Sequence, residues 1–457
     1  MIKRLLILLP LLWVAVRADT LRLTADDAVR LALTNNRQIA LAQARLDEAA
    51  AGKGVAFGSF LPQVNGTGTY TRLATASQLS LMFAHESVFG LPVFDPSGNY
   101  IGSTMPVPVA VGVDTYNLKL SSVNNFSIGV SAQQTLFTWG KLVNAYRIAG
   151  LAADIQKAGC TQARAQVRVD ATSGFYQALL ARKTAGLMRE SYDQLSRHVD
   201  QVQSLYDNGL ATRLDVMKAT LGLTNLGAQL SQVENGTALA LAALRVTLGL
   251  PEDQALTMDD DLQPESLSVD LGVATDSALA RRPELQQLRD ALGIASLGTK
   301  IARAANLPNA FAQFNYSYKD PVGFSGKWGS DWNATAGLSM PLFTGLSNLN
   351  KLHQSQARKR QAEVALAQVE DGIRLEVQAN VLALNQEAKN IGYQSRAVEV
   401  AQQALSLAEQ RYQNGLLTNL EYMDTQLALT QSRISYVNSL ANYQVAKAKL
   451  SKAMGGE

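Results

Sequence analysis

The chain has 457 residues, of which 17% are charged, and its formal net charge is +3. So small a charge, without a basic cluster, excludes a nucleic-acid-binding protein. The single cysteine, Cys160, excludes a disulfide framework, and we expect it to be a small packing residue on a helix.

Residues 1–18 have the pattern of a secretory signal peptide. Lys3 and Arg4 precede an apolar run, and small residues precede a cleavage site after Ala18. The alternative, a short membrane anchor, is disfavoured because the apolar run is too short to span a bilayer comfortably. No later run reaches about 18 apolar residues, so we predict no transmembrane helix in the mature chain.

Four segments alternate apolar and polar residues with the period of two that predicts half-buried strands. They lie at about 62–72, 124–137, 308–319 and 331–343. In the second, Phe126, Ile128 and Val130 are separated by small or polar residues. One apolar face opposite a small polar face is typical of an outer-membrane barrel strand. A strand on a soluble core fits any one segment, but four of them in an exported chain favour the membrane.

The first two predicted strands are separated by a long segment, roughly 73–124. It is too apolar for a disordered linker, with Met82, Phe83, Phe89 and Phe94 among its residues. We expect it to form an enlarged loop that projects at the cell surface or folds over the mouth of the barrel. Its counterpart between the last two strands, 320–331, is short and rich in glycine.

Two long segments without proline, 141–205 and 346–412, predict helices that could each reach roughly 100 Å. Helices of this length indicate a coiled-coil or helical-barrel assembly rather than a compact globule. Each ends in an Asn-Gly break, which supplies the positive φ that a helix C-cap requires. Thr212 and Thr418 follow the breaks as candidate N-caps of the returning helices. The connector 251–275 is predicted to lie on the surface alongside these helices.

The second half of the chain repeats the first. LYDNGLATRLDVM begins at Leu205 and RYQNGLLTNLEYM at Arg411, an offset of 206 residues. The LP pairs at Leu61 and Leu307 are offset by 246, so the first copy carries 40 extra residues between its strands. A tandem duplication with one enlarged loop is the simplest explanation. We therefore predict two repeats, 19–262 with a tip turn at about 206–212, and 263–457 with a tip turn at about 412–418.

Four strands cannot close a barrel around a lumen, because two unpaired edges would remain in the lipid. Several chains must therefore combine their strands. Two chains would supply eight strands and three would supply twelve, and the periodicity does not decide between these numbers.

The duplicated layout, the paired GLxTxxD/E tips, the LP strand entrances and the PLFTG strand exit, 341–345, resemble the TolC-like outer-membrane efflux proteins, or outer membrane factors. The resemblance covers essentially the whole mature chain. It implies a mixed all-α and membrane-β fold, in which a homotrimer forms a 12-stranded barrel in the outer membrane. Two tandem repeats per chain would continue this barrel into a long α-helical barrel in the periplasm.

The resemblance also implies roles for the tips. The positions that match a groove for a periplasmic adaptor are Gly209, Leu210, Thr212, Gly415, Leu416 and Thr418. Asp215 and Tyr412 match residues that latch neighbouring helices, and Glu421 and Asp424 match acidic rings that constrict the entrance. Rings of carboxylates around a narrow lumen would favour cations. Where the best-known member of the family has a latch arginine, between the positions of Gly415 and Glu421, this chain has Leu417. Capping and ordinary inter-helix pairing are the alternative roles for all of these residues.

The implied function is a passive exit duct that conducts small toxic molecules outward from an inner-membrane pump. Its partners would be the periplasmic adaptor, an RND, ABC or MFS transporter and outer-membrane lipid, without nucleic acid. One alternative is the outer-membrane component of a type I protein secretion system, and another is a soluble periplasmic coiled-coil scaffold, which would lack the alternating strands. No enzyme, cofactor or metal site is predicted, because His85, His198 and His353 are scattered and the aspartate triplet 259–261 lacks spaced ligands.

Overall fold

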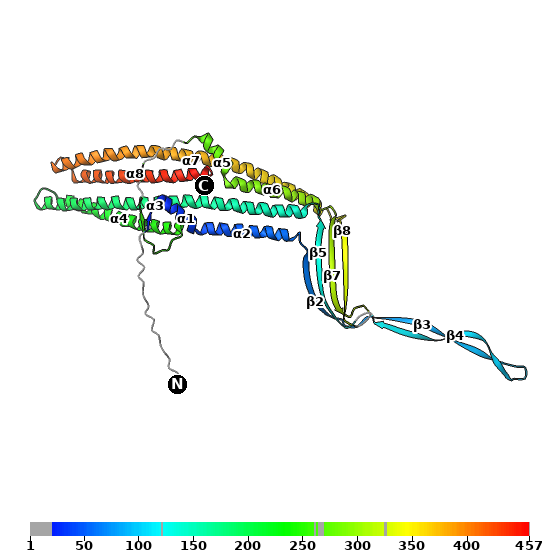
Figure 1. The fold of residues 1–457 in the computed structure, drawn as a ribbon. Helices are drawn as coiled ribbons and strands as arrows, with labels where there is room; N and C mark the ends of the chain where they lie inside the picture. Colours follow the sequence, from blue (N-terminus) through cyan, green and yellow to red (C-terminus); the bar gives the residue numbers. More distant parts are fainter. Residues whose placement is uncertain (1–20, 120–121, 260–261, 264–268, 324–326, 457) are drawn as a thin grey trace, which may run out of the picture. The chain divides into compact units, whose positions relative to one another are not determined.

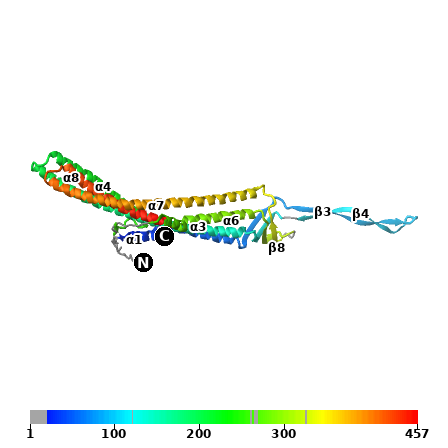
Figure 2. The ribbon, with the colours of Figure 1, turned by 90° about the horizontal axis from the view of Figure 1, so that it is seen from above.

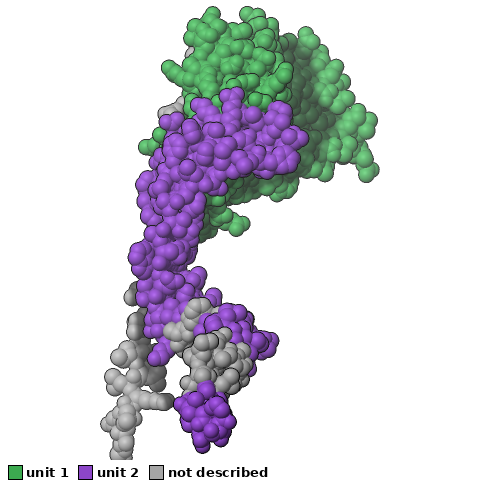
Figure 3. All heavy atoms as spheres, turned by 90° about the vertical axis from the view of Figure 1, so that its right-hand side faces the viewer, with its two compact units in different colours: residues 1–52, 148–296, 356–457 green, residues 53–147, 297–355 purple. Residues whose placement is uncertain are grey.

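The computed structural model describes residues 21–119, 122–259, 262–263, 269–323 and 327–456. The predicted signal peptide, 1–18, lies outside the described residues. The chain divides into two compact units (Figure 3). The first unit comprises Met1–Gly52, Ile148–Ser296 and Gln356–Glu457, and the second comprises Lys53–Arg147 and Leu297–Ser355.

The helices occur as two series of closely matched lengths (Figures 1 and 2). The first series is α1 (Ala25–Asn35, 11 residues), α2 (Arg37–Gly58, 22), α3 (Lys141–Asp207, 67) and α4 (Arg213–Leu248, 36). The second is α5 (Leu271–Arg281, 11 residues), α6 (Pro283–Ala304, 22), α7 (Ser347–Gln413, 67) and α8 (Asn419–Ala453, 35). The matched lengths are what a tandem duplication produces. None of the described helices is long and apolar enough to cross a membrane.

Each series of helices has its own hydrophobic core in the first unit. In the first series, Phe175 of α3 is buried with Leu244 of α4 and with alanines of α1. In the second, Tyr443 of α8 is buried with Val377 of α7 and with alanines of α5. The short helices α1 and α5 therefore cover the long helix pairs in equivalent ways, because alanine permits close approach.

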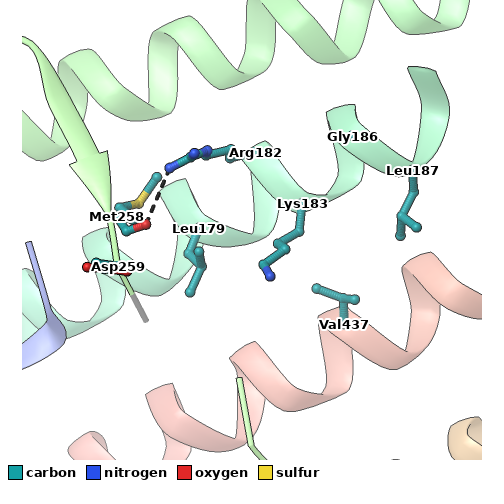
Figure 4. Close-up of a pocket in the computed structure, with 8 residues that line it drawn as sticks. All are labelled: Leu179, Arg182, Lys183, Gly186, Leu187, Met258, Asp259 and Val437. Carbon is teal, nitrogen blue, oxygen red and sulfur yellow. Dashed lines mark hydrogen bonds between the residues drawn. The ribbon is translucent and has the colours of Figure 1, made fainter. Parts of the chain in front are cut away.

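A short parallel pair of strands joins the start of the chain to the segment between the repeats. Strand β1 (Leu21–Leu23) pairs with β6 (Leu256–Met258). The guanidinium of Arg182 on α3 donates to the carbonyl oxygen of Met258 at 3.3 Å, which holds β6 against the long helix (Figure 4). Part of the connector 251–275, predicted to lie on the surface alongside the helices, is thus a strand, and its last residues belong to α5.

The second unit contains an antiparallel sheet in the order β2–β5–β7–β8. Its strands are β2 (Gln63–Arg72), β5 (Asn124–Phe137), β7 (Asn309–Asp320) and β8 (Gly329–Ser339). In register across the sheet, Val130 of β5 faces Tyr316 of β7, which faces Trp332 of β8. These residues share one face, and the intervening serines, threonines and asparagines share the other. The large side chains of the apolar face are exposed.

Strand β8 ends at Ser339, earlier than the 331–343 expected from its alternation. Pro341 explains the difference, because proline has no N–H with which to continue the ladder. In β5, where no proline interrupts the corresponding residues, the strand continues to Phe137.

Most of the segment 73–124, expected to be a loop, forms a long β-hairpin. Strand β3 (Gln78–Phe94) pairs only with β4 (Tyr100–Lys119) among the described residues. Near its base, Leu81 lies opposite Tyr116 on an exposed apolar face, whereas on the other face Ser80 donates to Asn117 at 2.5 Å. The 40 extra residues therefore add regular structure to the first repeat.

We predict that Gly249→Ala destabilises the first core. Gly249 caps α4 with φ +66°, and a Cβ atom there would lie 2.6 Å from the backbone oxygen of Asn35. The left-handed backbone alone costs a non-glycine residue about 1 kcal/mol, and the steric clash adds to this cost. Thermal unfolding followed by circular dichroism should show a lower midpoint.

Gly236→Ala is the matched control, because it lies within α4 and a Cβ atom there meets nothing within 4 Å. Alanine should raise helix stability there by about 0.5–1 kcal/mol. Equal midpoints for the two variants would contradict the packing described for Gly249.

Candidate functional site

The two turns that connect the long and short helices have the same backbone structure. Gly209 has φ +78° and Gly415 has φ +71°, a conformation that favours glycine. Each turn closes with a hydrogen bond across six residues, from Leu210 N to Leu205 O (2.8 Å) and from Leu416 N to Arg411 O (2.9 Å). These are Schellman motifs, which stop the helix and fix the direction of the following chain. Leu210 and Leu416 are left exposed at the turns.

The returning helices start with identical capping boxes. Thr212 is the N-cap of α4, and its N–H and hydroxyl donate to Oδ2 of Asp215 at 3.0 and 2.6 Å. Thr418 caps α8 and donates in the same way to Oε2 of Glu421 at 2.9 and 2.7 Å. In return, the N–H groups of Asp215 and Glu421 donate to the threonine hydroxyls. Thr212 and Thr418 therefore act as the N-caps predicted from the sequence.

These caps control the charge of the two carboxylates. Hydrogen bonds from Thr212 lower the pKa of Asp215, and those from Thr418 lower the pKa of Glu421. A carboxylate that accepts hydrogen bonds is favoured in its ionised form. Asp215 and Glu421 are therefore ionised at neutral pH.

A groove of about 590 Å³ lies between the two turns of the chain. It is lined by Gln201, Leu205, Leu210, Ala211, Asp215, Tyr412, Gln413, Asn414, Gly415, Leu417, Thr418 and Asn419. Five of the residues singled out in the sequence thus meet in one place, two from the first turn and three from the second. The turns lie far apart in sequence, so the groove depends on packing between the repeats.

The other predicted residues lie close to the turns but do not line the groove. Gly209, Thr212 and Leu416 belong to the turns themselves. Glu421 and Asp424 are exposed near the start of α8, three residues apart and so on neighbouring turns of one face.

Asp215 and Tyr412 interact electrostatically across the groove. Burial of the Tyr412 ring is the main cause that raises its pKa, and the carboxylate of Asp215 contributes to the same rise. Within the described part of the chain, no hydrogen bond joins the two side chains, because Asp215 is engaged by Thr212. Leu417 also lines the groove.

The sequence analysis did not predict a cluster of buried side chains that adjoins the groove. Asn419 is the first residue of α8 and is 5% exposed, and His198 of α3 is 4% exposed. The ring of His198 lies 4.5 Å from that of Tyr422 and 5.2 Å from that of Tyr412. Comparison of the two repeats could have indicated these positions, because each of the three residues is replaced by a different one in the other repeat. At the 206-residue offset, Ala404 corresponds to His198, Arg213 to Asn419 and Val216 to Tyr422.

The site offers capped carboxylates, exposed leucines and a buried aromatic cluster. Among the described residues, no group of three or more histidine, cysteine or acidic side chains could hold a metal ion. The arrangement can therefore hold two helical hairpins together and present a groove between them.

Comparisons with known proteins identify relatives over nearly the whole chain. The family model described as "Outer membrane efflux protein" matches residues 28–250 and 274–456. A probable efflux pump outer membrane protein of Pseudomonas putida, TtgC, is 26% identical over 436 residues, which cover 94% of this chain and 82% of TtgC. The pyoverdine export outer membrane protein OpmQ of Pseudomonas aeruginosa is 25% identical over 446 residues, with 94% and 85% covered.

The fold is likewise similar to solved structures. The crystal structure of the Campylobacter jejuni CmeC outer membrane channel superposes with a TM-score of 0.75 at 18% identity, covering 94% of this chain and 85% of CmeC. At 18% sequence identity, this similarity shows a shared fold only.

We predict that Thr212→Ala and Thr418→Ala each weaken a tip by about 1 kcal/mol, because an N-cap hydroxyl is lost. Hydrogen exchange of the first-turn amides of α4 and α8 should accelerate. At low pH the protection factors of the same amides, which are exchange rates corrected for the intrinsic effect of pH, should fall as well. Because the folded-state pKa values of Asp215 and Glu421 are lowered, the caps are at full strength above the unfolded values of about 4 and weaken as pH falls through the folded ones.

The control variants are Thr212→Ser and Thr418→Ser, which keep the hydroxyl and should exchange like the native protein. If alanine and serine variants exchanged at the same rate, the capping boxes would have no role in tip stability.

Proposed function

The chain belongs to the family of outer membrane efflux proteins, and from this premise we propose that it is the outer-membrane exit duct of a tripartite efflux system. It passively conducts small toxic molecules outward. A periplasmic adaptor and an inner-membrane transporter of the RND, ABC or MFS class are its partners. The strands lie in the outer membrane and the long helices form a tunnel in the periplasm.

The open four-stranded sheet carries this proposal. One face is apolar and aromatic, with Tyr70 and Phe126 in ring contact at 4.8 Å and Tyr318 stacked on Trp328 at 5.1 Å. The other face is small and polar. A sheet that is apolar toward lipid and polar toward a lumen is the arrangement of an outer-membrane barrel.

The edges of this sheet support a homotrimer. Among the described residues, β2 pairs only with β5 and β8 pairs only with β7. Unpaired edges cannot face lipid, because every backbone polar group there needs a partner. We propose that β2 of one copy pairs with β8 of the next, and that three copies close a 12-stranded barrel.

The long helices leave apolar stripes that a neighbouring copy would cover. Exposed apolar residues recur every seven or eleven residues along α7, which places them on one side after two or three turns. They are Val364, Leu375, Leu382, Tyr393, Val400 and Leu407. Helix α4 has a similar stripe of Leu214, Met217, Leu221, Leu239 and Val246.

Two equivalent methionines, one in each repeat, also support contact between helices of neighbouring copies. Met423 of α8 is 5% exposed, because it packs against Gly222 of α4 within the chain. Met217, its counterpart in the first repeat, is 61% exposed. If the repeats alternate around a ring, Met217 packs against the equivalent of Gly222 in the next copy, which is Ala428.

We propose that the tips form the gate and the adaptor site. Asp215, Tyr412, Glu421 and Asp424 narrow the periplasmic aperture. The adaptor docks at the two turns, where Gly209 and Gly415 fix the backbone, Leu210 and Leu416 offer exposed apolar contacts, and Thr212 and Thr418 cap the returning helices. The separate docking turns would let an adaptor pull the hairpins apart without unfolding either helix pair.

Small-molecule export is favoured over type I protein secretion. The names of TtgC and OpmQ describe an efflux pump component and an exporter of pyoverdine. At about 25% identity these names support the class of cargo and leave the individual substrate to experiment.

We predict that Met217→Cys combined with Ala428→Cys, in a Cys160→Ser background, forms cross-links between copies. A short bifunctional thiol reagent should convert the protein into dimeric and trimeric bands on denaturing gels, because these exposed positions correspond to the buried Met423–Gly222 contact.

Leu239→Cys with Ala428→Cys is the control, since Leu239 shares the α4 stripe but lies about 33 Å along the helix from Met217, at 1.5 Å per residue. Bands of equal strength for both pairs would indicate random collision. A monomer with no bands for either pair would exclude the proposed trimer.

We also predict that the purified protein forms cation-selective channels in planar bilayers. Glu421→Gln together with Asp424→Asn should reduce the selectivity, because repeated carboxylates around an entrance attract cations. Glutamine at 421 retains the capping box, so the change removes charge with little effect on structure. The reversal potential in a salt gradient measures the effect.

Asp276→Asn is the control, because Asp276 is exposed on α5, the short helix that covers the outside of the second core. It should leave the reversal potential unchanged. Absence of conductance in the native protein would contradict the duct itself, whereas an unchanged reversal potential in the 421/424 variant would contradict only the acidic entrance.

A further inference from the structure

The side chain of Asn419 connects the two helical hairpins of one chain. Its amide nitrogen donates to the backbone oxygen of Asp215, in the first turn of α4, at 3.0 Å. Its amide oxygen lies 2.6 Å from Nε2 of His198 on α3. Because the amide oxygen can only accept, Nε2 of His198 is the protonated nitrogen of the neutral ring. One buried side chain thus joins α8 to both α3 and α4.

The ring of His198 is enclosed by aromatic side chains from the second repeat. Tyr412 of α7 and Tyr422 of α8 stack on each other with ring centroids 5.2 Å apart, and both contact the imidazole. Burial lowers the pKa of His198, and its hydrogen bond to Asn419 offsets part of this effect. The structure therefore holds a neutral imidazole against two stacked, neutral phenols.

The cluster occurs once in each chain. The equivalent positions of the other repeat hold alanine, arginine and valine, so the same contacts cannot form where α7 and α4 of different copies would meet. The cluster consequently holds together the two hairpins of one chain. Separation of these hairpins would expose His198 and break both hydrogen bonds of Asn419.

We propose that His198 and Asn419 are positioning residues that hold the α7–α8 tip against the α3–α4 tip, and that protonation of His198 releases this contact and widens the aperture. The proposal rests on the proposed function and adds a means of regulation to the same site. It also assigns the holding contact to this buried pair.

The sign of the pH effect follows from the groups that face the ring. Tyr412 and Tyr422 have raised pKa values through burial, so both stay neutral near pH 7. The capped carboxylates of Asp215 and Glu421 have lowered pKa values and stay ionised. Glu409 of α7 acts on Tyr422 as a further negative charge. Of the groups with shifted pKa values around the groove, His198 is the one whose ordinary, unshifted pKa lies between about pH 5 and 8.

An imidazole exposed by opening would have a pKa of about 6.5, above that of the buried ring. The closed contact is therefore at full strength above that pH and weakens as pH falls below it. Acidification of the periplasmic side favours the open tip.

The test is single-channel conductance in planar bilayers between about pH 8 and pH 5. The native protein should show a several-fold rise as pH falls. His198→Gln retains a donor for Asn419 without a titrating ring, so it should keep low conductance throughout. His198→Ala and Asn419→Ala should conduct strongly at every pH.

The control variant carries His85→Gln and His353→Gln, which leaves His198 as the only histidine. It should retain the native pH response. Heat-resistant oligomers on denaturing gels establish that each variant has folded.

Native-like conductance in folded His198→Ala and Asn419→Ala overturns the assignment, and a pH response that persists in His198→Gln overturns the role of protonation. These results leave the duct intact. A native protein without any conductance instead contradicts the proposed function.

Discussion

In lipid, every backbone N–H and C=O group must find a partner within protein, and this requirement explains most of what is unusual about the chain. In the described part of the chain, the sheet of β2, β5, β7 and β8 has only four strands, with β2 and β8 at its edges. Such a sheet is stable in a membrane only when copies supply the missing neighbours. The apolar stripes on α4 and α7 also lack a partner within the described part of the chain. In water, contact with a neighbouring copy would bury these apolar side chains. In the proposed trimer, each chain is therefore one third of a ring.

The duplicated sequence gives each chain two similar but unequal halves. The matched lengths of α1 and α5, α2 and α6, and α3 and α7 preserve one plan, and each half has its own core. Identical residues nevertheless have different environments, as Met217 and Met423 illustrate. A residue of one repeat packs within the chain, whereas its equivalent faces outward. Local sequence therefore determines the shape of each hairpin, and the order of the repeats determines which surfaces remain free.

The sequence was most informative where structure depends on neighbouring residues. Alternation identified the sheet strands, the Asn-Gly breaks identified the tip turns, and the family recognised from these features is confirmed by the family match. The sequence was less informative where structure depends on contacts between residues that are far apart in the chain. The β3–β4 hairpin contains prolines and glycines, so its period of two was hidden. The parallel β1–β6 pair is too short to show a period, and the groove exists only because turns about 200 residues apart pack together.

The cluster around His198 was missed because the sequence analysis considered the residues that the two repeats share. Shared residues such as Gly209 and Gly415 identify what both hairpins need, which is a stable turn and a capped helix. Residues that differ, such as Asn419 against Arg213, identify where the hairpins must behave differently. If the tips open as we propose, some contacts must break before others, and identical repeats would provide only equal contacts. Under this proposal, the asymmetry that lets one contact break first resides in the few tip positions at which the two repeats differ, such as His198 and Asn419.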